Sequence, residues 1–287
     1  MLRSCLACLT FLFITASYSQ QVSPHSKLAY TFGSPGQKSI SDSITVSVSF
    51  TAEAIPEKLK SLIVIRNESK SVVIGKMRNA DIVKLTGINE VIFVSPIFSA
   101  KEELTTGAYD LSLNRINYAH ARMPLITGDT LQASIKERRF DTTDIDLKGR
   151  VFMSGVEAPD QTAHASLMTT IIAGGANSSP FARGVAWKAG VTSASFAQLL
   201  PEHDSVFQKY KISVQNHSYG TIVENFYGNE ARAYDLQMTS IPSLLHIFSA
   251  GNSGSVTSTS GPYAGVQQFA NLTGNFKHSK NSISVGS

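Results

Sequence analysis

Hydrophobic and polar residues alternate along the first third of the chain in a pattern that predicts a small α+β unit. Two segments, ITVSVSF and SLIVIRN, alternate with a period of two, which is typical of half-buried strands. The next segment, SVVIGKMRNADIVKLTGINEVIFVSP, predicts a strand, a short helix and a second strand closed by Pro96. We expect Asn79 to be the N-cap of that helix and Gly87 to end it. The unit covers residues 42–100.

The pattern changes at Leu131, after a polar connector over residues 101–130. Short apolar segments (LQASI, VTSASF, ISVQNHS, LLHIFSAG) alternate with helical ones (ASLMTTIIAG, DSVFQKY, NEARAYDLQMTS). Alternating strands and helices predict an α/β fold with a doubly wound parallel sheet over residues 131–287. In such sheets functional residues gather at the carboxyl ends of the strands.

The N-terminal segment, residues 1–19, has the features of a secretory signal peptide. Arg3 supplies a positive charge, and the apolar run over residues 6–16 is too short to cross a bilayer. We therefore expect a secreted or cell-surface protein with no membrane span after signal removal. Residues 20–41 form a polar, serine-rich stretch.

Composition excludes several classes of function. The 287 residues carry a formal net charge of +4 and no dense run of lysine and arginine, so we expect no nucleic-acid partner. Both cysteines, Cys5 and Cys8, lie inside the expected signal peptide. The mature chain would then have no disulfide, no thiol nucleophile and no cysteine-based metal site.

Three polar residues stand where chemistry is expected in such a sheet. Glu137 ends the strand LQASIKE on its apolar face, so it lies either in a site or at a solvated strand exit. His164 opens a helical run, where it can reach a neighbouring strand end or simply face solvent. Asn252 lies in the turn AGNSG after a buried strand, where an amide can stabilise an oxyanion or merely form a turn.

The order of these motifs resembles the subtilisin-like serine peptidases, the subtilases. HASLMTTIIAG, GVAWKAG, NHSYG, SAGNSG and NSISVGS follow one another as the corresponding family segments do. The resemblance implies a subtilisin-like sheet, incomplete at the C-terminus, with His164 as the catalytic histidine and Asn252 in the oxyanion hole. It also implies that Ser218, Tyr219 and Gly220 bind the backbone of a peptide or protein substrate.

The resemblance also selects one acid from the stretch LQASIKERRFDTTDIDLKGR. An ungapped match on DLKG places Glu137 at the position of the catalytic aspartate, although KER replaces the family's Asp-Thr-Gly. Glutamate can serve as the acid of such triads. Asp141 is the next candidate. Asp144 and Asp146 could help to hold a structural calcium ion, and otherwise we expect no cofactor or metal.

The unit over residues 42–100 resembles the inhibitory prosegments of the same family, which shield the cleft and assist folding. The family's nucleophile lies in Gly-Thr-Ser-x-Ala-x-Pro, and no serine of this sequence stands in that motif. We therefore expect the chain to be the front part of a longer, monomeric enzyme and to be inactive as given. The full protein would be a secreted serine endopeptidase.

A different class of protein stays open. The chain could be a non-catalytic, subtilase-like binding or scaffolding module, because a glutamate replaces the acid and the serine is missing. A metal-dependent hydrolase is disfavoured, because no HExxH or comparable ligand spacing is present.

Overall fold

The protein is described from a computed structural model. The described residues are 27–29, 42–103, 111–257, 265–266 and 271–286. The expected signal peptide, residues 1–19, lies outside them, as does most of the polar stretch 20–41. Within these ranges no helix is both long enough and apolar enough to cross a membrane.

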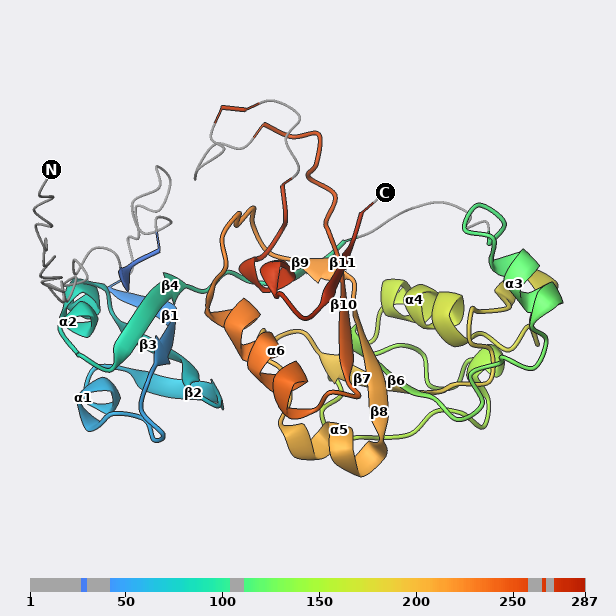
Figure 1. Ribbon diagram of the computed structural model, residues 1–287, viewed down its shortest axis with the longest axis horizontal. Helices are drawn as coiled ribbons and strands as arrows, with labels where there is room; N and C mark the ends of the chain where they lie inside the picture. The colour runs from blue at the N-terminus through green and yellow to red at the C-terminus, as the bar shows by residue number, and fades with distance from the viewer. Residues whose placement is uncertain (1–26, 30–41, 104–110, 258–264, 267–270, 287) are drawn as a thin grey trace, which may run out of the picture.

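The N-terminal part is an antiparallel α+β unit, as the alternation predicts (Figure 1). Its four-stranded sheet has the order β2-β3-β1-β4. The elements are β1 (Ser43–Phe50), α1 (Glu57–Lys60), β2 (Val64–Ser69), β3 (Val72–Arg78), η3 (Asn79–Asp81), α2 (Ile82–Thr86) and β4 (Val91–Pro96). Val46 and Val48 of β1 pack with Leu59 and Leu85 of the helices in a closed apolar core.

The start of the predicted helix differs from the expectation. Asn79 lies inside the 3₁₀ turn η3, and Asp81 precedes α2 as its N-cap residue without a side-chain capping bond. The reason is electrostatic. The Asp81 carboxylate lies 2.7 Å from both Arg78 Nε and Lys84 Nζ, which fixes the turn in place of an asparagine cap. Gly87 does end α2, as predicted.

The second part is an α/β domain built on a five-stranded parallel sheet of order β11-β10-β8-β6-β7, which confirms the predicted fold class. Its strands are β6 (Gln132–Glu137), β7 (Gly190–Ser195), β8 (Ile212–His217), β10 (Leu245–Ser249) and β11 (Ile283–Val285). Its helices and turns are η4 (Ile145–Leu147), α4 (Ala163–Ala173), η5 (Pro180–Ala182), α5 (Asp204–Tyr210), α6 (Asn229–Ser240) and η6 (Asn275–His278).

Strand β6 is covered on both faces. Alternation of polar and apolar residues within a single strand would instead predict one buried and one exposed face. Ala133 and Ile135 pack against α4 on one face. On the other face Lys136 is fully buried and its ammonium lies 5.9 Å from the ring centre of Tyr234 in α6. A strand in a parallel sheet with helices on both sides has no solvent-exposed face.

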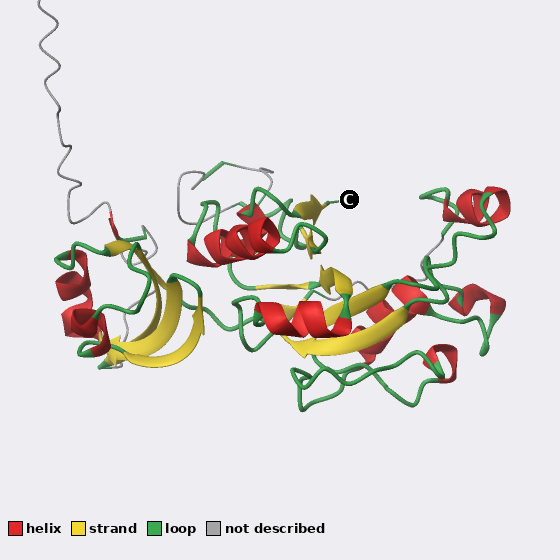
Figure 2. Ribbon diagram, turned by 60° about the horizontal axis from the view of Figure 1, so that its bottom comes forward, coloured by secondary structure: helices red, strands yellow, loops and turns green. Residues whose placement is uncertain are grey.

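The two parts meet at α6, which lies between them in Figures 1 and 2. At the start of α6, Asn229 Nδ2 donates to the backbone oxygens of Ser47 (3.0 Å) and Phe93 (3.2 Å). Ile74 of β3 packs on Ala233 of the same helix. The helices α1 and α2 cover one face of the N-terminal sheet, and α6 covers part of the other (Figure 2).

The chain then passes from the N-terminal unit into the α/β domain as a strand. β5 (Lys101–Glu102) pairs antiparallel with β9 (Tyr219–Gly220), which directly follows β8. A short helix, α3 (Ile116–Arg122), lies between this pairing and β6 along the chain. The connector therefore crosses the carboxyl-terminal edge of the parallel sheet, where functional residues are expected.

Candidate active site

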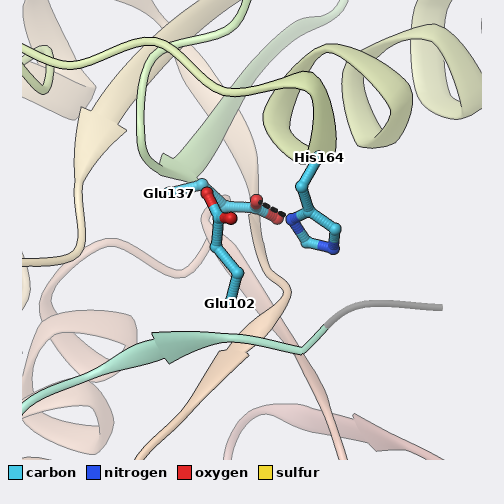
Figure 3. A group of neighbouring side chains, drawn as sticks. All are labelled: Glu102, Glu137 and His164. Carbon is cyan, nitrogen blue, oxygen red and sulfur yellow. Dashed lines mark hydrogen bonds and ion pairs between the residues drawn. The ribbon is translucent and has the colours of Figure 1, made fainter.

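The carboxyl end of β6 and the first turn of α4 bring Glu137 and His164 together. His164 Nδ1 lies 2.6 Å from Glu137 Oε2, and both side chains are buried (Figure 3). Thr162 caps α4 by accepting a hydrogen bond from the backbone N–H of Ala165, which fixes the helix start that carries His164. The structure thus brings together Glu137, which the sequence places at the end of a strand, and His164, which the sequence places at the start of a helix.

The electrostatics of this pair favour a protonated imidazole. Burial raises the pKa of the Glu137 carboxyl, and the hydrogen bond from His164 opposes that rise. The same bond raises the pKa of His164, while burial opposes it. The other ring nitrogen, Nε2, lies 3.1 Å from the backbone oxygen of Glu103. Each ring nitrogen thus has an oxygen atom within hydrogen-bonding distance while segment 101–103 lies on β9.

A second acid, Glu102, approaches the pair from the connector. Oxygen and nitrogen atoms of Glu102, Glu137 and His164 lie within 4.8 Å of one another, close enough for a shared cation (Figure 3). The 2.6 Å contact between Glu137 and His164 is instead a direct hydrogen bond, since two ligands of a tetrahedral metal lie more than about 3 Å apart. Glu102 Oε1 accepts from Thr162 Oγ1 at 2.6 Å. The arrangement is that of an acid–base pair.

The other acids of the stretch after β6 hold the loop together. Asp141 Oδ1 accepts from the backbone N–H (2.9 Å) and the hydroxyl (2.7 Å) of Thr143. Asp144 caps η4 by accepting from the backbone of Asp146 at 2.9 Å. The buried Asp146 carboxylate accepts from the backbone N–H and hydroxyl of Ser178. These contacts account for the carboxylates of all three residues within the chain itself.

Two of the predicted peptide-binding residues, Tyr219 and Gly220, form the strand β9 that pairs with the connector, and Ser218 directly precedes it. Lys101 lies opposite Gly220 and Glu102 opposite Tyr219. The backbone N–H of Glu103 donates to the backbone oxygen of Ser218 at 3.2 Å. The extended peptide that lies on this strand is therefore the chain's own segment 101–103.

Asn252 lies in the turn that follows β10, at the same edge of the sheet. Gly251 adopts φ +101°, a backbone conformation that favours glycine, so the chain turns sharply at the end of β10. Asn252 is exposed on that turn. The glycine of the AGNSG motif thus has a conformational role that the sequence already suggests.

Sequence reasoning missed the partner of the Glu103 side chain, which is 10% exposed. Its carboxylate contacts Lys277, Thr273 and Ser249, which belong to segments far away in the sequence. The only available signal was an adjacent acid pair in KEEL, since Lys277 lies in the polar stretch NLTGNFKHSKNS before β11. No spacing rule links residues 174 positions apart.

Comparisons with known proteins agree with this geometry. The family model described as "Subtilase family" (Peptidase_S8) matches residues 131–287. The structure is similar to the epidermin leader peptide processing serine protease EpiP of Staphylococcus aureus, with a TM-score of 0.57 and 15% identity. That match covers 86% of this chain and 70% of EpiP, and at this identity it shows the fold alone.

A second similar structure is fervidolysin of Fervidobacterium pennivorans, described as a keratinolytic enzyme related to subtilisin. The TM-score is 0.49 and the identity 15%, over 73% of this chain. The chain spans 40% of the length of fervidolysin. No curated protein sequence matches the chain.

Proposed function

Because the chain belongs to the subtilase family, we propose that the protein is a secreted serine endopeptidase in which Glu137 and His164 are the acid and the base of the triad. The observation that carries the proposal is the 2.6 Å hydrogen bond between Glu137 and His164 at the edge of the sheet. The N-terminal segment with signal-peptide features supports secretion.

The proposed reaction uses the chain's own groups as follows. Glu137 accepts the hydrogen bond from Nδ1, which orients the imidazole and stabilises its cation. Nε2 then removes the proton of a serine hydroxyl and later delivers it to the leaving amine. That serine belongs to the family's Gly-Thr-Ser-x-Ala-x-Pro motif, which this sequence does not contain. The amide of Asn252 donates to the oxyanion that develops on the attacked carbonyl.

We further propose that the N-terminal unit is an inhibitory prosegment. Its trailing residues, 101–103, occupy the backbone of β9 in the antiparallel pairing that an extended substrate would make. The backbone oxygen of Glu103 lies 3.1 Å from His164 Nε2, close to the base that serves the reacting carbonyl. A substrate cannot pair with β9 while this segment lies there.

The experiment uses the product of the full reading frame and measures hydrolysis of an unstructured protein such as casein. His164→Ala and Glu137→Ala should each lower kcat by about 10³-fold or more. Asp141→Asn is the matched control, since Asp141 contacts Thr143 in its loop, and it should leave the rate unchanged.

Two outcomes would contradict the proposal. Full activity in Glu137→Ala would show that the triad acid lies elsewhere. A wild-type protein that binds unfolded peptides but hydrolyses none would be the non-catalytic binding module instead.

A further inference from the structure

The connector places one side chain in the pocket beside the reacting position. Glu103 donates its N–H to the Ser218 oxygen at 3.2 Å, and its own carbonyl oxygen faces His164 Nε2 at 3.1 Å. Resting on the proposed function, these two contacts put Glu103 where a substrate residue would lie if its carbonyl were attacked. Its side chain therefore marks the pocket that selects that residue.

The pocket that receives Glu103 is built for a carboxylate. Lys277 Nζ donates to Oε1 at 3.0 Å and to Oε2 at 2.9 Å. The Thr273 hydroxyl donates to Oε1 and the Ser249 hydroxyl donates to Oε2. Each carboxylate oxygen thus receives one bond from an ammonium and one from a hydroxyl. Charge-assisted hydrogen bonds of this kind are about twice as strong as neutral ones.

The three donors are arranged around one another as well as around the ligand. Lys277 Nζ also donates to the Thr273 hydroxyl oxygen at 2.9 Å and lies 3.4 Å from that of Ser249. The Thr273 hydroxyl therefore accepts the third N–H of the ammonium, which leaves its own proton directed at the carboxylate. A glutamine at this position would turn its NH₂ group toward a donor, and an apolar side chain would leave all three donors without an acceptor.

Two glycines leave the space that the Glu103 carboxylate occupies. A Cβ atom on Gly220 or on Gly251 would meet Glu103 Oε1 and the hydroxyl of Thr273. The strand that binds the substrate backbone and the turn after β10 thus both approach the carboxylate without side chains. Aspartate is one methylene shorter than glutamate, so its carboxylate would not reach both hydroxyls with the backbone held on β9.

The buried lysine needs an acidic partner. The Lys277 side chain is 0% exposed, and Glu103 is the only acid paired with it among the residues that the structure describes. Burial lowers the pKa of Lys277, and the neighbouring Glu103 carboxylate opposes that effect. When the connector leaves the cleft, the ammonium loses its counter-ion. A buried charge without a partner is costly, and an incoming glutamate would restore the pair.

We propose that the protein cleaves on the carboxyl side of glutamate, with Lys277, Thr273 and Ser249 as the residues that determine this specificity. The same pocket selects the chain's own Glu103 for self-processing. In that step water adds across the bond between the Glu103 carbonyl carbon and the Leu104 nitrogen, so the carbon takes the hydroxyl and the nitrogen takes the hydrogen. No further reactant is needed.

The first test measures whether Glu103 and Lys277 recognise each other, and it requires no catalysis. We would compare the thermal midpoints of the 287-residue chain, Glu103→Gln, Lys277→Met and the double variant. Each single change should lower the midpoint by several degrees, and the double variant should lose clearly less than the sum. Glu102→Gln is the matched control, because the neighbouring Glu102 bonds Thr162 and should show no coupling to Lys277→Met. Additive effects of Glu103→Gln and Lys277→Met would overturn the proposal.

The second test measures specificity in the product of the full reading frame. Peptides that differ only at the residue before the cleaved bond would carry Glu, Gln, Asp or Phe there. We expect kcat/KM for the Glu peptide to exceed that for the Gln peptide by about 100-fold or more. A glutamine side chain would leave at least one of the donors of Lys277, Thr273 and Ser249 without an acceptor. Lys277→Met should remove most of this preference, and Thr273→Val, which keeps the charge, should reduce it by about tenfold. N-terminal sequencing of the processed protein should begin at Leu104.

The outcomes separate this inference from the proposed function. Hydrolysis of all four peptides at similar rates would overturn the glutamate specificity and leave the peptidase intact. Hydrolysis of no peptide would contradict the proposed function, and the thermal coupling between Glu103 and Lys277 would then decide alone whether the pocket recognises a carboxylate.

Discussion

Lys136 and Lys277 are both buried and paired with a glutamate, but they take that partner from different places. Lys136 lies within β6, and its Nζ is 2.7 Å from Glu202 Oε1 and 2.6 Å from the backbone oxygen of Leu200. Glu202 belongs to the same α/β domain. Lys277 lies in η6, and its Nζ is 2.9 Å from an oxygen of Glu103, which the connector supplies.

The difference separates a permanent ion pair from a conditional one. The Lys136 pair stays closed as long as the sheet is folded, because α6 and the chain around Leu200 cover it. The Lys277 pair exists only while the segment 101–103 lies on β9. When the partner of a buried charge can leave, the charge can bind another group of opposite sign. When the partner is fixed, the ion pair is a permanent part of the core.

The largest effect is expected at Lys136. Lys136→Met would leave the Glu202 carboxylate buried with Gln215 as its remaining side-chain partner. We expect the free energy of unfolding to fall by about 3–5 kcal/mol, the usual cost of breaking a buried pair from one side. Urea unfolding followed by circular dichroism measures this. Adding Glu202→Leu should recover much of the loss, and no recovery would show that packing rather than charge is responsible.

A smaller effect is expected at Lys277. Lys277→Met should lower the free energy of unfolding by about 2 kcal/mol, because the Glu103 side chain can turn to water when its connector shifts. The same urea measurement applies. A loss as large as that of Lys136→Met would break the comparison, since it would make both pairs equally structural.

Among the residues that the structure describes, Glu224 is a buried acid without a lysine partner, in contrast to Glu202 and Glu103. Burial raises the pKa of Glu224 to about 8, and the nearby Glu230 adds to the rise. The ordinary value is 4.5, so between these two values the folded state keeps a proton that the unfolded chain has lost. Stability is therefore fully present below pH 4.5 and decreases as the pH rises toward 8, by about 1.4 kcal/mol per pH unit.

Glu224→Gln tests this pH dependence. The variant should be less sensitive to pH over the same range, while Glu53→Gln, at an exposed residue, should keep the wild-type slope. The thermal midpoint measured from pH 5 upward gives the slopes. Identical slopes in wild type and Glu224→Gln would mean that Glu224 is charged in the folded protein.

Much of the fold could be predicted from local sequence patterns, and two of the site residues from their positions near the ends of strands. The bounds of α5 and α6 coincide with the helical segments DSVFQKY and NEARAYDLQMTS expected from the sequence. Glu137 and His164 could be selected because parallel strands place their carboxyl ends at one edge. Asn79 was wrongly expected as an N-cap, since the ion pairs of Asp81 decide that turn.

The rest depends on the path of the chain. The burial of Lys136 follows from helices on both faces of the sheet, which alternation within one strand does not reveal. The contact between Glu103 and Lys277 requires the connector to cross the sheet edge in one register against β9. Neither residue stands out by type or spacing, because the signal arises only when two distant segments are brought together.

Thr273 and Lys277 lie four residues apart in one short segment, so both can be transferred to another protein together. Gly274, with φ +128°, lies between them, and Lys277 is carried by the 3₁₀ turn η6. Two of the three groups that hold the carboxylate are therefore carried by the contiguous segment 273–277. Grafting this segment, together with the serine at the end of β10, onto another protein with the same sheet architecture would transfer the specificity for glutamate.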